Sequence, residues 1–193
     1  MLTSKVITNK LPEVKRVKEI LKSEFCPREM APWWFLIKKA KKANNEFLAF
    51  YDGDDMVGII FLVTLKRVKK SDIKKDITYV LYFAVDPMYH SKGYGSSILT
   101  EIEKRYSENL IWLTVEPKDE SAKNSVNRVR RIEFYKKNNL IANGLKIKMR
   151  DMPFDVLVNN KDDINLIDIH ICKQVQRYFL GAIIYPFYAP KEI

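Results

Sequence analysis

Two stretches near the start of the chain follow a helical period. From Leu11 to about Glu24 apolar side chains recur every three or four positions, which predicts a helix with Pro12 in its first turn. From about Pro32 to Lys42 the apolar positions again share one face and the lysines take the other, so a second helix follows. We expect both helices to precede every strand of the fold.

The period then changes to that of strands. Residues 47–51 and 56–65 are short β-branched or aromatic runs on either side of Asp52-Gly53-Asp54-Asp55, and this arrangement predicts a hairpin. The charged stretch 66–76 is too polar for a core and leads into residues 78–86. Because that segment is almost unbroken in its apolar character, it is expected to be a central strand covered on both faces.

A strand-helix-strand unit comes next. Helical spacing returns from Tyr94 to Tyr106 and is followed by a strand over 110–116, so the two flanking strands are expected to be parallel. A helix over 125–138 and strands over 141–149 and 154–158 complete the core, and the tail predicts a short helix near 167–179 and a weak strand at 182–188.

These elements describe one α/β (α+β) domain with a mixed central sheet flanked by helices. It spans residues 1–193, with a core of about 11–158 and a C-terminal extension of about 159–193. At 193 residues, 47% of them hydrophobic, the chain has the length for one substantial core.

Charge and cysteine content narrow the function classes only partly. The chain has 34 Lys and Arg against 24 Asp and Glu, a net charge of +10, which suits nucleic acid, an anionic membrane or a small polyanion such as a nucleotide cofactor. Cys26 and Cys172 have neither metal-ligand spacing nor the density of a disulfide scaffold. The longest apolar stretch, about 178–189, is too short to span a bilayer. We therefore expect a cytoplasmic protein with reduced thiols and no metal site.

The segment DPMYHSKGYGSS (86–97) carries the most specific chemistry. Gly93 and Gly95 lie between the buried strand and the following helix, where backbone N–H groups meet the positive end of a helix dipole. Such a turn is a phosphate cradle, and Lys92 adds a cation at its rim. The alternative is an ordinary strand-to-helix turn whose glycines relieve backbone strain. The patterns of the dinucleotide fingerprint and of the P-loop are both absent.

Two segments resemble the GNAT superfamily of N-acetyltransferases. VDPMYHSKGYGSSIL (85–99) is similar to the acetyl-CoA pyrophosphate loop, Gln/Arg-x-x-Gly-x-Gly/Ala, with His90 at its first position. NRVRRIEFYKKNNLI (127–141) is similar to the last core helix, with Asn139-Leu140 in place of Gly-Phe. The resemblance implies splayed central parallel strands and acetyl-CoA (coenzyme A) as cofactor. The cofactor-binding residues that it implies are Phe83, Ala84, Val85, His90, Ser91, Lys92, Gly93, Tyr94, Gly95 and Ser96.

The family resemblance also implies an acyltransferase reaction, in which a primary amine of a small molecule or peptide attacks the thioester directly. Tyr135 matches the tyrosine placed beside the cofactor sulfur and is expected to give a proton to the thiolate; the alternative is a tyrosine packed on the core beside Phe134. Glu116 ends a strand on the side of the expected cleft and can deprotonate the amine, directly or through a water. Its alternative role is a solvated carboxylate.

Two other function classes stay open. A basic nucleic-acid-binding protein would use the lysines, but these are interleaved with acids along several elements, so we expect neither nucleic acid nor a membrane as partner. A catalytically silent acyl-CoA-binding module is compatible with the same fold. A homodimer is also open.

Overall fold

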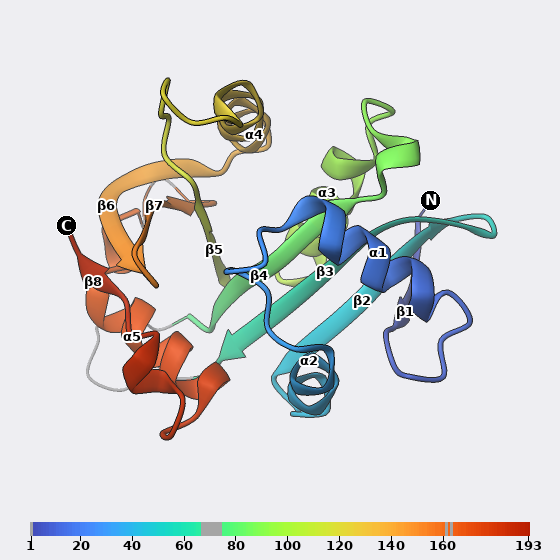
Figure 1. Cartoon of the computed structure of the whole chain (residues 1–193), viewed down its shortest axis with the longest axis horizontal. Coiled ribbons are helices and arrows are strands. Elements are labelled where there is room, and N and C mark those ends of the chain that lie inside the picture. Colours follow the sequence, from blue (N-terminus) through green and yellow to red (C-terminus); the bar gives the residue numbers. More distant parts are fainter. Residues whose placement is uncertain (1, 67–74, 161, 163) are drawn as a thin grey trace. The chain divides into compact units, whose positions relative to one another are not determined.

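The computed structural model describes residues 2–66, 75–160, 162 and 164–193 (Figure 1). The helices are α1 (Val14–Glu24), α2 (Trp33–Ala40), α3 (Tyr94–Arg105), α4 (Ser125–Lys137) and α5 (Ile169–Leu180), with short 3-10 turns η1 (Pro87–Tyr89), η2 (Ile164–Leu166) and η3 (Tyr185–Phe187). The strands are β1 (Thr3–Val6), β2 (Asn45–Asp52), β3 (Asp55–Leu65), β4 (Ile77–Val85), β5 (Leu110–Val115), β6 (Ile141–Met149), β7 (Met152–Val158) and β8 (Lys191–Glu192).

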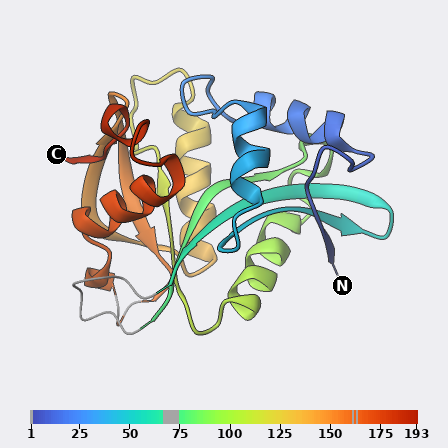
Figure 2. The ribbon, with the colours of Figure 1, turned by 90° about the horizontal axis from the view of Figure 1, so that it is seen from below.

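The chain forms two compact units. The first comprises Met1–Val63 with Val80–Ser107, and the second comprises Thr64–Tyr79 with Glu108–Ile193. In the first unit the strand order is β1-β2-β3-β4, with β1 and β3 both antiparallel to β2. Helices α1 and α2 cover one face of these strands and α3 covers the other (Figure 2). Since both faces are covered, β3 is buried from Met56 to Thr64.

Gly58 marks a close approach inside the first unit. A Cβ built there would lie 2.8 Å from the Ala84 carbonyl oxygen and 2.8 Å from Ile98 Cδ1. Backbone cannot move aside as a side-chain tip can, so we expect Gly58→Ala to lower the free energy of unfolding by about 1–3 kcal/mol, measured by urea denaturation. Gly53→Asn is the matched control. Gly53 is left-handed (φ 59°), and a Cβ built there would meet no atom within 4 Å. Because asparagine tolerates this conformation, the free energy of unfolding should change by less than about 0.5 kcal/mol.

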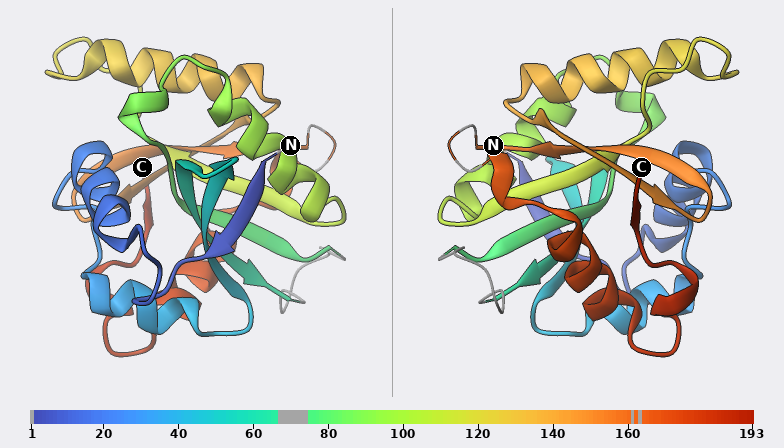
Figure 3. Two further views of the ribbon diagram at one scale, coloured as in Figure 1. Left: turned by 90° about the vertical axis from the view of Figure 1, so that its right-hand side faces the viewer. Right: turned by 90° about the vertical axis from the view of Figure 1, so that its left-hand side faces the viewer.

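The second unit contains the strands β5 to β8 and the first residues of β4. Its order runs from the first residues of β4 through β5-β7-β6-β8, and β7 and β6 each pair antiparallel with their neighbours on both sides. Helices α4 and α5 lie on opposite faces of this part of the sheet (Figure 3), and β5 is correspondingly buried at every position except Thr114. The N-cap carboxylate of α5, Asp168, accepts a hydrogen bond from the Ile171 N–H at 2.8 Å.

The helix, hairpin and strand predictions within residues 14–158 are confirmed, and the tail helix is confirmed as α5. Three predictions about the order and bounds of the elements are wrong. Strand β1 precedes both early helices and pairs with β2; its four residues, TSKV, are too few and too polar to show a strand period. Helix α1 begins at Val14 rather than at Leu11, because residues 8–14 form turns instead. The tail has the 3-10 turn η3 where residues 182–188 predict a strand.

One lysine of α2 does not lie on the solvent face. Lys39 is only 7% exposed, and its Nζ lies 4.8 Å from the centre of the Phe35 ring. Burial, followed by repulsion from Lys42 and Lys38, lowers its pKa.

The predicted polar connection 66–76 falls largely outside the described residues, which omit 67–74.

None of the helices in the described part of the chain combines the length and the apolar character that a membrane span needs. Cys26 is exposed and Cys172 is buried, and neither forms a disulfide.

Candidate functional site

The glycine turn has the backbone geometry of an anion-binding helix terminus. Gly93 is the N-cap of α3 in the left-handed conformation (φ 86°, ψ −8°), and Ser91 before it is also left-handed (φ 61°). The Ser97 N–H bonds back to the Gly93 carbonyl at 3.1 Å. The three N–H groups between them belong to the first turn of α3, where an α-helix offers no carbonyl acceptor. They therefore present the positive end of the helix dipole.

Open space adjoins this turn. A Cβ at Gly93 would meet no atom within 4 Å, so glycine is required by the positive φ and not by crowding. Lys92 is exposed at the rim, and its Nζ lies 5.0 Å from the centre of the Tyr89 ring. The turn combines unobstructed backbone donors with a nearby cation, as a pyrophosphate requires.

A partly buried ion pair holds the start of the loop. Asp86 follows β4 and is 2% exposed, and both of its oxygens accept hydrogen bonds from the Arg16 guanidinium of α1, one from Nε at 2.6 Å. Oδ1 also accepts the Met88 N–H at 3.0 Å, and the Asp86 N–H donates to the Val57 carbonyl of β3 at 2.9 Å. Asp86 therefore fixes the point at which β4 passes into the loop.

His90 touches the end of β4. Its Nε2 lies 3.0 Å from the carbonyl oxygen of Val85, the last of three residues, Phe83 to Val85, whose backbone the family resemblance assigns to the pantetheine arm. Ala84 is buried, whereas Phe83 and Val85 are partly exposed. The His90 ring thus contacts the same strand end as the predicted pantetheine site.

Glu116, in the second unit, is enclosed by cations. It follows β5 and is 19% exposed. Oε1 accepts a hydrogen bond from Arg128 at 2.7 Å, and Oε2 accepts one from the Asn124 side-chain amide at 3.2 Å and lies 3.5 Å from Arg131. Both oxygens are engaged, so this carboxylate ties the β5–α4 connection to the first turns of α4.

Tyr135, also in the second unit, is the only buried residue of α4, at 7% exposure. Its ring centre lies 5.3 Å from that of Phe134, which is partly exposed. Burial, partly offset by the charge of Arg131, raises the pKa of Tyr135 to about 12. The phenol therefore stays protonated at neutral pH and can donate a hydrogen bond.

The end of α4 adopts the conformation that its sequence predicts. Asn139 is left-handed (φ 61°), as a Gly-Phe terminus would be. Leu140 is 2% exposed, and its N–H donates to the Tyr135 carbonyl at 3.0 Å. The substitution of Asn-Leu for Gly-Phe therefore preserves both the turn and the apolar anchor.

Comparison with protein families assigns the fold. The model of the acetyltransferase (GNAT) family matches residues 14–138. The chain belongs to the GNAT acetyltransferase family. This match spans the whole of the glycine turn and the second resembling segment as far as Asn138, including Tyr135. A search of curated proteins gives no significant match.

Solved GNAT structures share the fold at low sequence identity. A GNAT-family protein from Bacteroides thetaiotaomicron is 21% identical, with a TM-score of 0.64 over 95% of this chain and 98% of that one. Arabidopsis thaliana NAA60, solved with acetyl-CoA, is 14% identical with a TM-score of 0.57 over 82% and 98%. An aminoglycoside 6'-N-acetyltransferase, solved with coenzyme A, is 14% identical with a TM-score of 0.56 over 81% and 95%.

In this GNAT chain the glycine turn fits the family's cofactor. The pyrophosphate of acetyl-CoA needs several N–H donors and a cation, and residues 91–96 offer both beside open space. None of these donors is a side chain that must first be oriented, because the backbone conformation of Ser91 and Gly93 already sets their direction.

Three hydrogen-bonded contacts near the glycine turn and the early helices carry no sequence signal. Arg16 is 70 residues from Asp86. Tyr82 of β4 donates to the Glu29 carbonyl at 2.8 Å and accepts the Ala31 N–H at 2.9 Å, which anchors the α1–α2 connection. Tyr94 donates to Asp52 at 2.7 Å. Only a covarying set of sequences could have pointed to these pairs.

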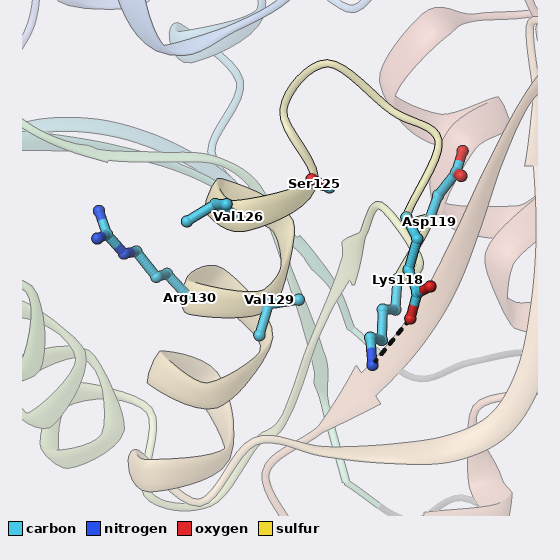
Figure 4. Close-up of a pocket in the computed structure, with 7 residues that line it drawn as sticks. Lys118, Asp119, Ser125, Val126, Val129 and Arg130 are labelled. Carbon is cyan, nitrogen blue, oxygen red and sulfur yellow. Dashed lines mark ion pairs between the residues drawn. The ribbon is translucent and has the colours of Figure 1, made fainter.

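A cavity of about 310 Å³ lies against the first turns of α4 (Figure 4). Val126, Val129 and Arg130 project from the helix, and Lys118 pairs with Glu120 at 3.8 Å in the β5–α4 connection. Val126 is nine residues from Tyr135 and so lies on the opposite side of α4. The cavity shares no residue with the predicted site.

No cluster of three or more metal-ligating side chains occurs among the residues that the structure covers.

Proposed function

We propose that this protein is an acetyl-CoA-dependent N-acetyltransferase that acetylates a primary amine of a small molecule or peptide by direct attack on the thioester. The observation that carries the proposal is the left-handed Gly93 at the N-terminus of α3, immediately after the loop that β4 enters. The match to the GNAT family over residues 14–138 supports it.

The loop residues bind and orient the cofactor in this proposal. Acetyl-CoA, when bound, supplies the acetyl group as a thioester. The N–H groups from Ser91 to Ser96 hold its pyrophosphate, with Lys92 and the hydroxyls of Ser91 and Ser96 at the rim. The backbone of Phe83 to Val85 orients the pantetheine arm, and an N–H there polarises the acetyl carbonyl. His90, in contact with Val85, steadies that strand end.

Tyr135 stabilises the departing sulfur by hydrogen bonding. With a pKa of about 12, its phenol is a weaker acid than a thiol, whose reference pKa is about 8.5. Full proton transfer from Tyr135 to sulfur is therefore uphill, whereas donation of a hydrogen bond from Oη is favourable. We therefore propose that Tyr135 acts on the sulfur as a hydrogen-bond donor.

Glu116 is proposed to position the β5–α4 connection. Both oxygens of this carboxylate already accept hydrogen bonds, from Arg128 and from Asn124, and Arg131 lies beside them, which supports a structural contact rather than contact with an acceptor amine. Deprotonation of the amine then falls to solvent or to a group of the acceptor pocket.

The proposed acceptor class is a primary amine. One of the three solved relatives named above is an aminoglycoside 6'-N-acetyltransferase, and an aminosugar presents a primary amine, as a peptide N-terminus does. A panel of N-terminal peptides, polyamines and aminoglycosides, assayed for thiol release from acetyl-CoA, separates these classes.

Calorimetric titration with acetyl-CoA and desulfo-CoA tests the cofactor site. Wild type should bind both, and Gly93→Val should lose about five- to thirtyfold in affinity, because valine disfavours a positive φ by roughly 1–2 kcal/mol. Gly93→Asn is the matched control: asparagine tolerates the left-handed conformation, and its affinity should stay within about threefold of wild type. Folded wild-type protein that binds neither ligand would refute the proposal.

A further inference from the structure

The turn between β2 and β3 contacts the proposed cofactor loop, residues 86–97, through Tyr94. The Tyr94 hydroxyl donates a hydrogen bond to Asp52 Oδ2 at 2.7 Å, and the two residues are 42 positions apart in the chain. Tyr94 is the first residue of α3 and directly follows the left-handed Gly93. The hydrogen bond to Asp52 raises the pKa of Tyr94, so the phenol remains a donor at neutral pH.

A second tyrosine supports the other end of the same loop. The rings of Tyr89 and Tyr94 meet edge to face, with centres 5.8 Å apart and planes at 85°. Desolvation, followed by a hydrogen bond with Asp55, raises the pKa of Tyr89. Lys92 lies over the Tyr89 ring at 5.0 Å. The stretch from 90 to 93 is therefore bracketed by two tyrosines, one of which, Tyr94, is hydrogen-bonded to an aspartate of the β2–β3 turn.

We infer that Asp52 is a positioning residue for cofactor binding, acting through Tyr94 to hold the cofactor loop in its anion-binding conformation before the cofactor arrives. This role rests on the proposed function, since it concerns the same loop. Ser91 and Gly93 both have positive φ, a conformation that an unsupported loop adopts only part of the time. The hydrogen bond from Tyr94 to Asp52 keeps the loop in that state, so less free energy is spent on ordering the loop when the cofactor binds.

The charge of Asp52 and its positioning role predict opposite changes in cofactor affinity. A carboxylate near a pyrophosphate site repels the ligand, so removing its charge should by itself strengthen cofactor binding. A positioning role predicts the reverse, because removal of the acceptor leaves Tyr94 unrestrained. The sign of the change in affinity thus separates the two effects.

Calorimetric titration with desulfo-CoA tests the inference on four variants: Asp52→Ala, Tyr94→Phe, their combination and the control Asp54→Ala. Asp54 lies in the same turn and carries the same charge. We expect each of the first two changes to raise Kd about fivefold, the loss of one hydrogen bond's contribution. The double variant should also lie near fivefold, because the residues act through one bond. Asp54→Ala should bind as tightly as wild type or more tightly.

Melting temperatures measured alongside separate positioning from stability. A structural role alone lowers the melting temperature and leaves the Kd of the folded protein unchanged, and this result would overturn the inference. Additive losses of about 25-fold in the double variant would also overturn it, as would unchanged or tighter binding by Asp52→Ala. In each of these three cases the proposed function stands, since wild type still binds. Absence of binding by wild type refutes the proposed function and the positioning role together.

Discussion

Replacing Arg16 by methionine is expected to lower the free energy of unfolding by about 3 kcal/mol, because it leaves the Asp86 carboxylate buried without its cation. Asp86 is 2% exposed and the Arg16 side chain is 36% exposed, so solvent reaches the pair from one side and the cost lies at the low end for buried pairs. For a chain of this size the melting temperature should fall by about 6–12 °C.

The matched control removes the other partner of Arg16. Glu19 lies 3.3 Å from the guanidinium but is 49% exposed, so Glu19→Gln should change stability by less than about 0.5 kcal/mol. Similar losses from Arg16→Met and Glu19→Gln would contradict the assignment of the stabilisation to the Asp86 pair.

The same pair has a defined pH dependence. Burial alone would raise the pKa of Asp86, but the hydrogen bonds from Arg16 and Met88 and the Arg16 charge together lower it. A carboxylate whose pKa is lower in the folded state adds stability above its unfolded pKa, about 3.9, and this stability is lost as the pH falls through the folded value. The difference in unfolding free energy between wild type and Asp86→Asn should therefore shrink below about pH 4, as measured by urea denaturation.

Replacing Tyr135 by phenylalanine should reduce kcat by about 100-fold while the Kd for acetyl-CoA changes by less than about twofold. The phenol acts on the departing sulfur, so its hydrogen bond counts in the transition state and not in cofactor binding. Stopped assays of thiol release, combined with calorimetry, separate the two quantities. Tyr185→Phe in η3 is the control and should leave both unchanged.

The raised pKa of Tyr135 makes two pH predictions. Because burial raises this pKa to about 12, ionisation of Tyr135 should add no limb to the pH–rate profile below about pH 11. A group whose folded pKa exceeds its unfolded value, near 10 for tyrosine, loses its contribution to stability as the pH rises through the folded value. Wild type should therefore lose stability relative to Tyr135→Phe between about pH 10 and pH 12.

A measurable kcat in wild type also distinguishes an enzyme from a silent acyl-CoA-binding module on the same fold. If wild type binds acetyl-CoA but releases no thiol with any amine of the panel, the Tyr135 prediction fails and the binding module is favoured.

Local patterns were sufficient for most of the elements and for the position of the strand-to-helix turn at Gly93. The apolar periods located α1 to α5 and the strands β2 to β7 because each period is completed within a few residues. The glycine at position 93 and the asparagine at 139 both adopt the left-handed conformation, which these two residue types tolerate better than most others.

Tertiary structure alone decided the partners of the polar side chains. Arg16 and Asp86 are 70 residues apart and Asp52 and Tyr94 are 42 apart, and no spacing rule connects such pairs. Glu116 and Lys39 show the same limit: a carboxylate at a strand end and a lysine on a helix both read as solvated, yet one is held among arginines and the other is buried. The sequence by itself determined where the backbone turns and which segments are apolar, because these properties are local. Which charge meets which depends on how distant segments fold against one another, and that information lies in the packing.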